Sequence, residues 1–87
     1  MKEREIAIYK IIDDILWFEW DPIGVNDIAL RDEYASYTPA ILSLKIGNAD
    51  LKTIADKLYD FEVKYMGIFG GRERCERVAK KIIAINI

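Results

Sequence analysis

The 87-residue chain is expected to form an all-α fold, a compact antiparallel bundle of four main helices in a single domain spanning residues 1–87. Apolar residues recur every three or four positions in four segments, and short connections rich in Gly, Asn and Asp separate these segments. No segment shows the period-two alternation of a half-buried strand. A composition of 52% hydrophobic and 32% charged residues is typical of a folded globular domain of this length.

The first helix is predicted over residues 5–18. Its apolar residues share one face at about 100° per residue and are Ile8, Ile11, Ile12, Ile15 and Leu16. Lys10, Asp13 and Asp14 lie on the opposite face. Trp17 falls close to Lys10 and Asp13 around the helix, so we expect its ring to face water.

Residues 19–26 are predicted to form a structured loop with one tight turn. Asp21 is a suitable helix N-cap, Pro22 fixes its own φ angle, and Gly24 permits a positive φ angle. Trp20 can anchor in the end of the bundle. We therefore interpret this loop as a structural element first and as a binding site only second.

The second helix is predicted over residues 27–45, interrupted by Pro39. One face carries Leu30, Tyr34, Tyr37, Ile41 and Leu44. Proline removes a helical hydrogen bond and disfavours the α conformation of the preceding residue, here Thr38. The segment is therefore either one helix kinked at Pro39, or two short helices with Thr38 as the second N-cap. The apolar phase continues through Pro39, which slightly favours the kink.

The third helix is predicted over residues 51–66, after a stop at Gly47-Asn48 and with Asp50 as its N-cap. Its apolar stripe comprises Leu51, Ile54, Ala55, Leu58, Tyr65 and Met66, flanked by Tyr59 and Phe61. The last helix is predicted over residues 72–85. Its expected buried face is Cys75, Val78, Ala79, Ile82 and Ile83, with Cys75 an inert core residue.

Glu62 interrupts the apolar stripe of the third helix. A buried carboxylate without a partner would cost several kcal/mol, so a donor must approach it. The candidate donors are Arg72, Tyr34 and Tyr37. We interpret the group as a structural polar clasp, in preference to a catalytic acid in a pocket.

The residue inventory argues against most catalytic and metal chemistry. The chain has no His and a single cysteine, Cys75, which excludes Cys/His zinc sites and nucleophiles activated by His. The acidic residues of 19–33 lack the spacing of a calcium loop, and the basic residues of 72–81 alternate with acids like a solvated face. We expect no catalytic, metal or cofactor site, no nucleic-acid partner and no membrane segment, with a cytoplasmic location.

Charge and aromatic content favour a protein-binding role. Residues 1–50 carry a net charge of −5 and residues 51–87 a net charge of +3. This difference can guide a partner or, as we favour, let the two halves of the fold attract each other. The partner-binding candidates are Trp17, Asp13, Asp14 and Trp20. The function expected is a protein-interaction module such as an adaptor, inhibitor or immunity protein; the alternatives are a self-associating homodimer and a small carboxylate enzyme or ligand-binding protein.

Several short runs resemble a known family. They are Trp20-Asp21-Pro22-Ile23-Gly24, Asp32-Glu33-Tyr34, the Leu-Tyr-x-Phe-Glu stretch at 58–62, and the Cys75-x-x-Val-Ala-Lys-Lys helix. Across nearly the whole chain these runs resemble the short bacterial proteins grouped as domain of unknown function 1871. The resemblance implies a compact helical fold and brings no established activity and no functional residues.

Overall fold

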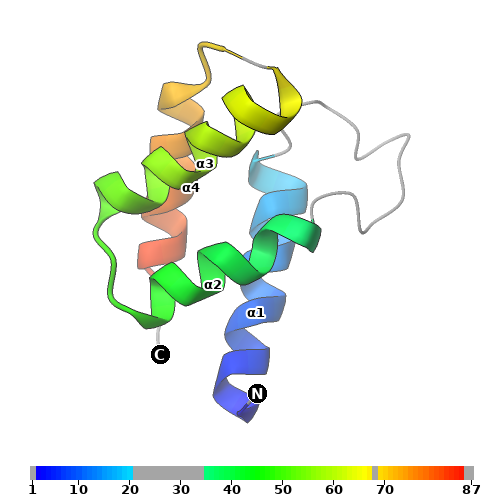
Figure 1. Cartoon of the computed structure of the whole chain (residues 1–87). Helices are drawn as coiled ribbons and strands as arrows, with labels where there is room; N and C mark the ends of the chain where they lie inside the picture. The colour runs from blue at the N-terminus through cyan, green and yellow to red at the C-terminus, as the bar shows by residue number, and fades with distance from the viewer. Residues whose placement is uncertain (1, 21–34, 68, 86–87) are drawn as a thin grey trace.

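A computed structural model of the chain describes residues 2–20, 35–67 and 69–85 (Figure 1). In order, its elements are α1 (Glu3–Ile15), the π-helix η1 (Leu16–Trp20), the 3₁₀ turn η2 (Ala35–Tyr37), α2 (Thr38–Ile46), α3 (Leu51–Met66) and α4 (Arg72–Ile83). This described part contains four α-helices and no strand, so the prediction of an all-α fold is confirmed. The helices α3 and α4 pack together, as do α1 and α2.

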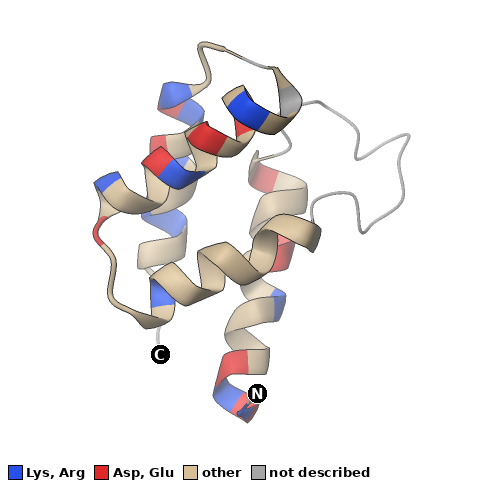
Figure 2. Cartoon of the chain, in the orientation of Figure 1, with Lys and Arg blue, Asp and Glu red and all other residues tan. Residues whose placement is uncertain are grey.

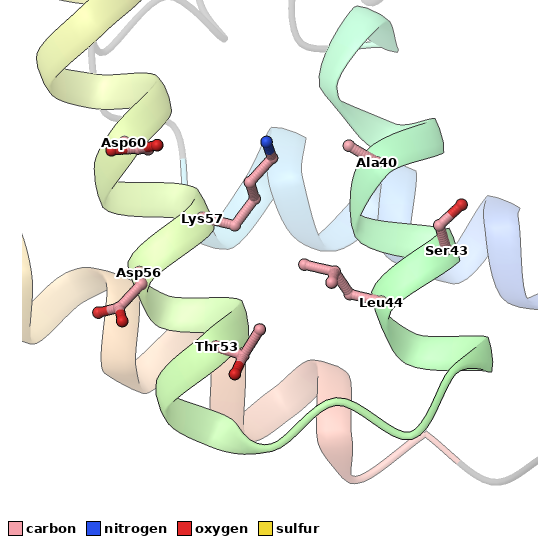
Figure 3. A pocket seen from close by; sticks show the side chains of 7 residues that line it. All are labelled: Ala40, Ser43, Leu44, Thr53, Asp56, Lys57 and Asp60. Carbon is pink, nitrogen blue, oxygen red and sulfur yellow. The ribbon is translucent and has the colours of Figure 1, made fainter.

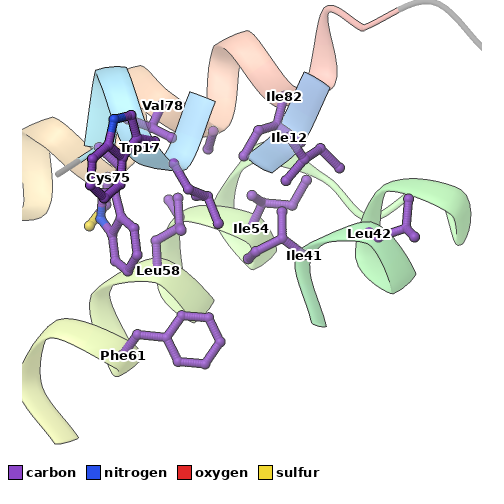
Figure 4. Packing of buried hydrophobic residues seen from close by; sticks show 14 of the residues in the cluster. Ile12, Trp17, Ile41, Leu42, Ile54, Leu58, Phe61, Cys75, Val78 and Ile82 are labelled. Carbon is purple, nitrogen blue, oxygen red and sulfur yellow. The ribbon is translucent and has the colours of Figure 1, made fainter. Parts of the chain in front are cut away.

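The helix α1 buries three of the five residues on its predicted face, whereas Ile11 is 44% exposed and Ile15 is only half-buried. Ile8, Ile12 and Leu16 are 2%, 0% and 0% exposed. From Leu16 the helix continues as the π-helix η1, whose hydrogen bonds reach one residue further back, so each residue advances less than 100° around the axis. Trp17 is nevertheless only 5% exposed, because η1 packs against α4 as well as continuing α1, and the prediction that its ring faces water is wrong (Figure 4).

The helix α2 begins at Thr38, with Pro39 in its first turn, where the missing N–H costs no hydrogen bond. Tyr37, not Thr38, is the N-cap residue, and no side chain caps this end. Residues 27–34, the expected first half of this helix, lie outside the described residues. The tighter winding of η2 changes the phase before α2. The buried face of α2 is therefore Thr38, Ile41, Leu42 and Lys45, while Leu44 from the expected face is only half-buried.

Both polar residues on the buried face of α2 have partners. The Thr38 hydroxyl donates to the Asp13 carboxylate of α1 at 3.2 Å. The Lys45 ammonium donates to the Ile83 carbonyl at the end of α4 at 2.7 Å. A helix C-terminus has free carbonyls and a negative dipole end, which suit a cation. These two side chains therefore tie α2 to α1 and to α4.

The helix α3 is delimited as the sequence predicts. The Asp50 carboxylate accepts from the Thr53 amide at 2.8 Å, and hydrogen bonding by Thr53, first through its side chain and then through this amide, lowers the pKa of Asp50. Gly67 ends the helix with a φ angle of 67°. Ile54, Ala55 and Leu58 are fully buried. In contrast, the expected core residue Tyr65 is 71% exposed because the helix projects beyond the core there.

The helix α4 completes the single cluster of buried apolar residues in the described part of the chain (Figure 4). Cys75, Val78, Ala79 and Ile82 have no exposed surface. Ile83, expected on the same face, is the last residue of α4 and is 39% exposed. Figure 2 shows both charge signs interleaved along the outer faces of α3 and α4.

Candidate functional site

The most concentrated polar chemistry of the described residues surrounds the Glu62 carboxylate, which is fully buried. The Trp20 indole N–H donates to its Oε2 at 2.8 Å and the Arg74 guanidinium donates to its Oε1 at 2.9 Å. The Cys75 thiol donates to Oε2 at 3.1 Å. We call Glu62, Trp20, Arg74 and Cys75 the carboxylate clasp. It joins the end of η1, the C-terminal part of α3 and the first turn of α4.

The start of α4 is built so that the carboxylate can come close. Gly71 is the buried N-cap residue, and a Cβ atom there would overlap Glu62 Oε1 and Arg74 Nη2. The absence of a side chain thus creates the space for the Glu62–Arg74 pair. The free N–H groups and positive dipole end of α4 also favour a negative charge at this place. The three donors Trp20, Arg74 and Cys75 therefore satisfy a buried carboxylate that would otherwise be costly.

Glu62 is buried, as the sequence predicts, but the residues that donate hydrogen bonds to it are not the predicted ones. The guanidinium that pairs with Glu62 belongs to Arg74 and not to Arg72. Arg72 lies two positions away, about 200° around the helix, and pairs with Asp56 and with Glu76 on the surface.

The expected tyrosines lie elsewhere. Tyr34 lies outside the described residues. The Tyr37 ring packs on Phe61 and on Trp20, with centroid distances of 4.6 Å and 5.8 Å. The donors Trp20 and Cys75 were not predicted. Trp20 has a signal in the sequence, because a buried indole N–H usually finds an acceptor, whereas Cys75 has none, because a buried thiol behaves as a small apolar group.

The Cys75 thiol is held in its protonated form. Burial raises its pKa to about 12, and the hydrogen bond to Glu62 and the negative charge of that carboxylate act in the same direction. A thiol with this pKa is almost entirely neutral at pH 7, so it is a poor nucleophile and keeps the proton that it shares with Glu62. The carboxylate clasp is thus suited to holding helices together.

We predict that Cys75 makes the protein lose stability in alkaline solution. Its pKa rises from 9.0 to about 12 on folding, so the folded state holds the proton more tightly. The resulting stability is complete below about pH 9 and is lost at about 1.4 kcal/mol per pH unit between about pH 9 and 12. Urea unfolding at about pH 9 and 10.5 should show the parent losing about 2 kcal/mol more than Cys75→Ala.

The comparison with Cys75→Ala isolates the thiol, because tyrosines and lysines titrate in the same range in both proteins. Parallel stability curves for the two proteins over this range would contradict the prediction.

A second site lies between α2 and α3, where an open groove of about 480 Å³ is found (Figure 3). Its lining comes from both helices and consists of Ala40, Ser43 and Leu44 on α2 and Thr53, Asp56, Lys57 and Asp60 on α3. The side chains of Leu44 and Lys57 extend into the space between the helices, whereas the Asp56 carboxylate points away from α2. We call this feature the α2–α3 groove.

The residues predicted to bind a partner do not form an exposed surface. Trp17 and Trp20 are 5% and 1% exposed, so neither ring is available to a partner in this conformation. Asp13 accepts a hydrogen bond from Thr38, and Asp14 is exposed. Within the described part of the chain, the two halves of opposite net charge meet where the Lys81 ammonium of α4 pairs with Glu19 of η1.

Comparison with known proteins adds no relative: no protein-family model, no curated protein and no solved structure matches the chain. The resemblance to domain of unknown function 1871 therefore stays a prediction. Among the described helices, none is long and apolar enough to cross a membrane. The same described residues contain no group of three or more Cys, Asp or Glu side chains placed to hold a metal ion.

Proposed function

We propose that the protein is a small non-catalytic protein-interaction module that binds its partner in the α2–α3 groove. The groove itself is the observation that carries this proposal. It combines a half-buried apolar surface from Ala40 and Leu44 with polar side chains along α3. A groove between two helices is a common docking place for an amphipathic helix, whose apolar side chains fill it.

The groups best suited to catalysis are occupied by structural contacts, which supports a binding role. All of Glu62 is buried, and both of its oxygens accept hydrogen bonds from protein side chains. The thiol of Cys75 is buried and protonated. A substrate would have to displace core residues to reach either group.

The proposal is tested by selecting helical peptides of about 15–20 residues from a displayed library on the parent protein. Two variants obstruct the groove from opposite walls, Leu44→Asp on α2 and Thr53→Arg on α3. Ile46→Asp is the matched control, because Ile46 lies on the same helix, is 41% exposed and does not line this groove.

The selected peptides should bind each groove variant at least about tenfold more weakly and the control within about twofold. Circular dichroism and urea unfolding serve to check that each variant is folded. Selection that yields no binder, or binders that tolerate both groove variants, would refute the groove as the binding site.

Self-association is a second candidate function. Ile6, Ile11, Ile46 and Ile83 are 39–44% exposed, and a second copy of the chain could cover such side chains. Size-exclusion chromatography with light scattering distinguishes the two candidates. A mass of 10.1 kDa at every concentration supports the interaction module, and a concentration-dependent dimer supports self-association.

We also propose that the four helices form an antiparallel bundle and that the protein works in the cytoplasm. The short connections at 47–50 and 67–71 support antiparallel neighbours, because such loops join helices that reverse direction. The buried free thiol of Cys75 suits a reducing compartment.

A further inference from the structure

We infer that the partner segment is an amphipathic helix with an acidic residue beside its apolar face, and that Lys57 pairs with this carboxylate. This inference rests on the proposed function of the α2–α3 groove. It assigns the chemistry of the partner, which the shape of the groove alone does not define.

The charged residues of the groove differ in how they are paired. Asp56 pairs with Lys52 and Arg72, and Asp60 pairs with Lys64 at 3.3 Å. These contacts neutralise both acids from outside the groove. Lys57 makes no ion pair with any described residue, and it is the charged side chain that Figure 3 shows reaching towards α2. When pairs between described residues are counted, the charge of the groove that is left without an opposite charge is therefore positive.

The surroundings of the Lys57 ammonium make it a strong site for a carboxylate. Its Nζ lies 5.2 Å from the centroid of the Phe61 ring, and Phe61 is 7% exposed. The ring face attracts the cation and holds it over an apolar surface. An ion pair formed there is less screened by water than one on an open helix face. The side chain is thus placed in advance for an arriving anion.

The partner must also fill the apolar part of the groove. Leu44 and Ala40 lie on the wall facing Lys57, and both are half-buried. A helix satisfies both walls when apolar side chains at positions i and i+3 or i+4 contact α2 while a neighbouring Asp or Glu faces α3. A basic helix would meet Lys57 as a like charge and would find Asp56 and Asp60 already paired.

The experiment uses the peptides selected on the parent protein, with affinities measured by calorimetry. We expect the selected sequences to share an Asp or Glu beside an apolar i, i+3 or i+4 pair. Replacing that acid by its amide should weaken binding to the parent by about tenfold or more. Lys57→Gln should weaken binding of the acidic peptide by a similar factor. Against Lys57→Gln the acidic and amide peptides should bind equally, because the double-mutant cycle removes the same pair.

Lys80→Gln is the matched control, since Lys80 is exposed on α4 outside the groove, and it should change affinity by less than about twofold. Peptides that lose affinity for Leu44→Asp are placed in the groove by that loss. If the same peptides bind Lys57→Gln as tightly as they bind the parent, the result would overturn this inference and leave the proposed function standing. Peptides that tolerate Leu44→Asp and Thr53→Arg, or a selection without binders, would overturn both.

Discussion

Replacing Glu62 by alanine is expected to destabilise the protein by about 3–5 kcal/mol, the typical cost of removing one partner of a buried ion pair. The variant would leave the Arg74 guanidinium, the Trp20 indole N–H and the Cys75 thiol without their shared acceptor. It would also leave a space where three elements meet. Urea unfolding at neutral pH should show a much lower midpoint with a similar slope.

Glu76→Ala provides the matched control, because Glu76 is also paired with an arginine, Arg72 at 3.5 Å, but its side chain is 47% exposed. Exposed pairs contribute about 0–1 kcal/mol, so this control should unfold close to the parent. Glu62→Gln should lie between the two, since an amide keeps the shape but presents N–H groups to one of the donors. Equal midpoints for Glu62→Ala and Glu76→Ala would show that the carboxylate clasp does not hold the fold together.

Local patterns in the sequence predict a large part of this fold. Helical periodicity places Ile8, Ile12 and Leu16 on the buried face of α1, and the structure confirms all three. The Asp50 cap and the break at Gly67 are confirmed too, because each depends on contacts within a few residues. The same reasoning predicts that a carboxylate is buried at position 62.

Helical periodicity gives wrong predictions where contacts between helices or changes of winding decide which side chains are buried. The prediction for Trp17 considers α1 alone, but η1 also packs against α4, and Trp17 is buried there. The face predicted for α2 assumes that the helical spacing of apolar residues continues unchanged through Pro39. The 3₁₀ turn before Thr38 changes this spacing, and Leu44 lines the groove. Neither effect has a reliable signal in a single sequence.

The candidate site depends on contacts between distant residues, which a single sequence does not provide. Periodicity tells which face carries Glu62, but the choice of Arg74 over Arg72 depends on how α4 is rotated against α3. Glu62 and Arg74 can approach each other because glycine at position 71 has no side chain. The α2–α3 groove likewise depends on the rotation of α2 and was not predicted.

Trp20→Ala is expected to cost about 3–5 kcal/mol, the usual range for truncating a buried aromatic residue to alanine. The ring is 1% exposed and packs against Tyr37 and Phe61, with centroids at 5.8 Å and 6.3 Å. Its N–H also donates to Glu62, so the substitution removes packing and a hydrogen bond at once. Residues 21–25 lie outside the described residues, and the anchoring role of their loop is tested here through Trp20 alone.

Two further variants separate these contributions. Trp20→Phe keeps most of the packing but leaves Glu62 without the indole donor, and should cost about 1–3 kcal/mol. Phe18→Ala is the control, because Phe18 lies in the same π-helix and is 66% exposed. This substitution should lower the free energy of unfolding by less than about 1 kcal/mol. Thermal and urea unfolding of the three variants should therefore follow the order Trp20→Ala, Trp20→Phe, Phe18→Ala from least to most stable. A Trp20→Phe variant as stable as the parent would mean that the indole N–H contributes nothing to the carboxylate clasp, and that Trp20 stabilises the end of η1 by packing alone.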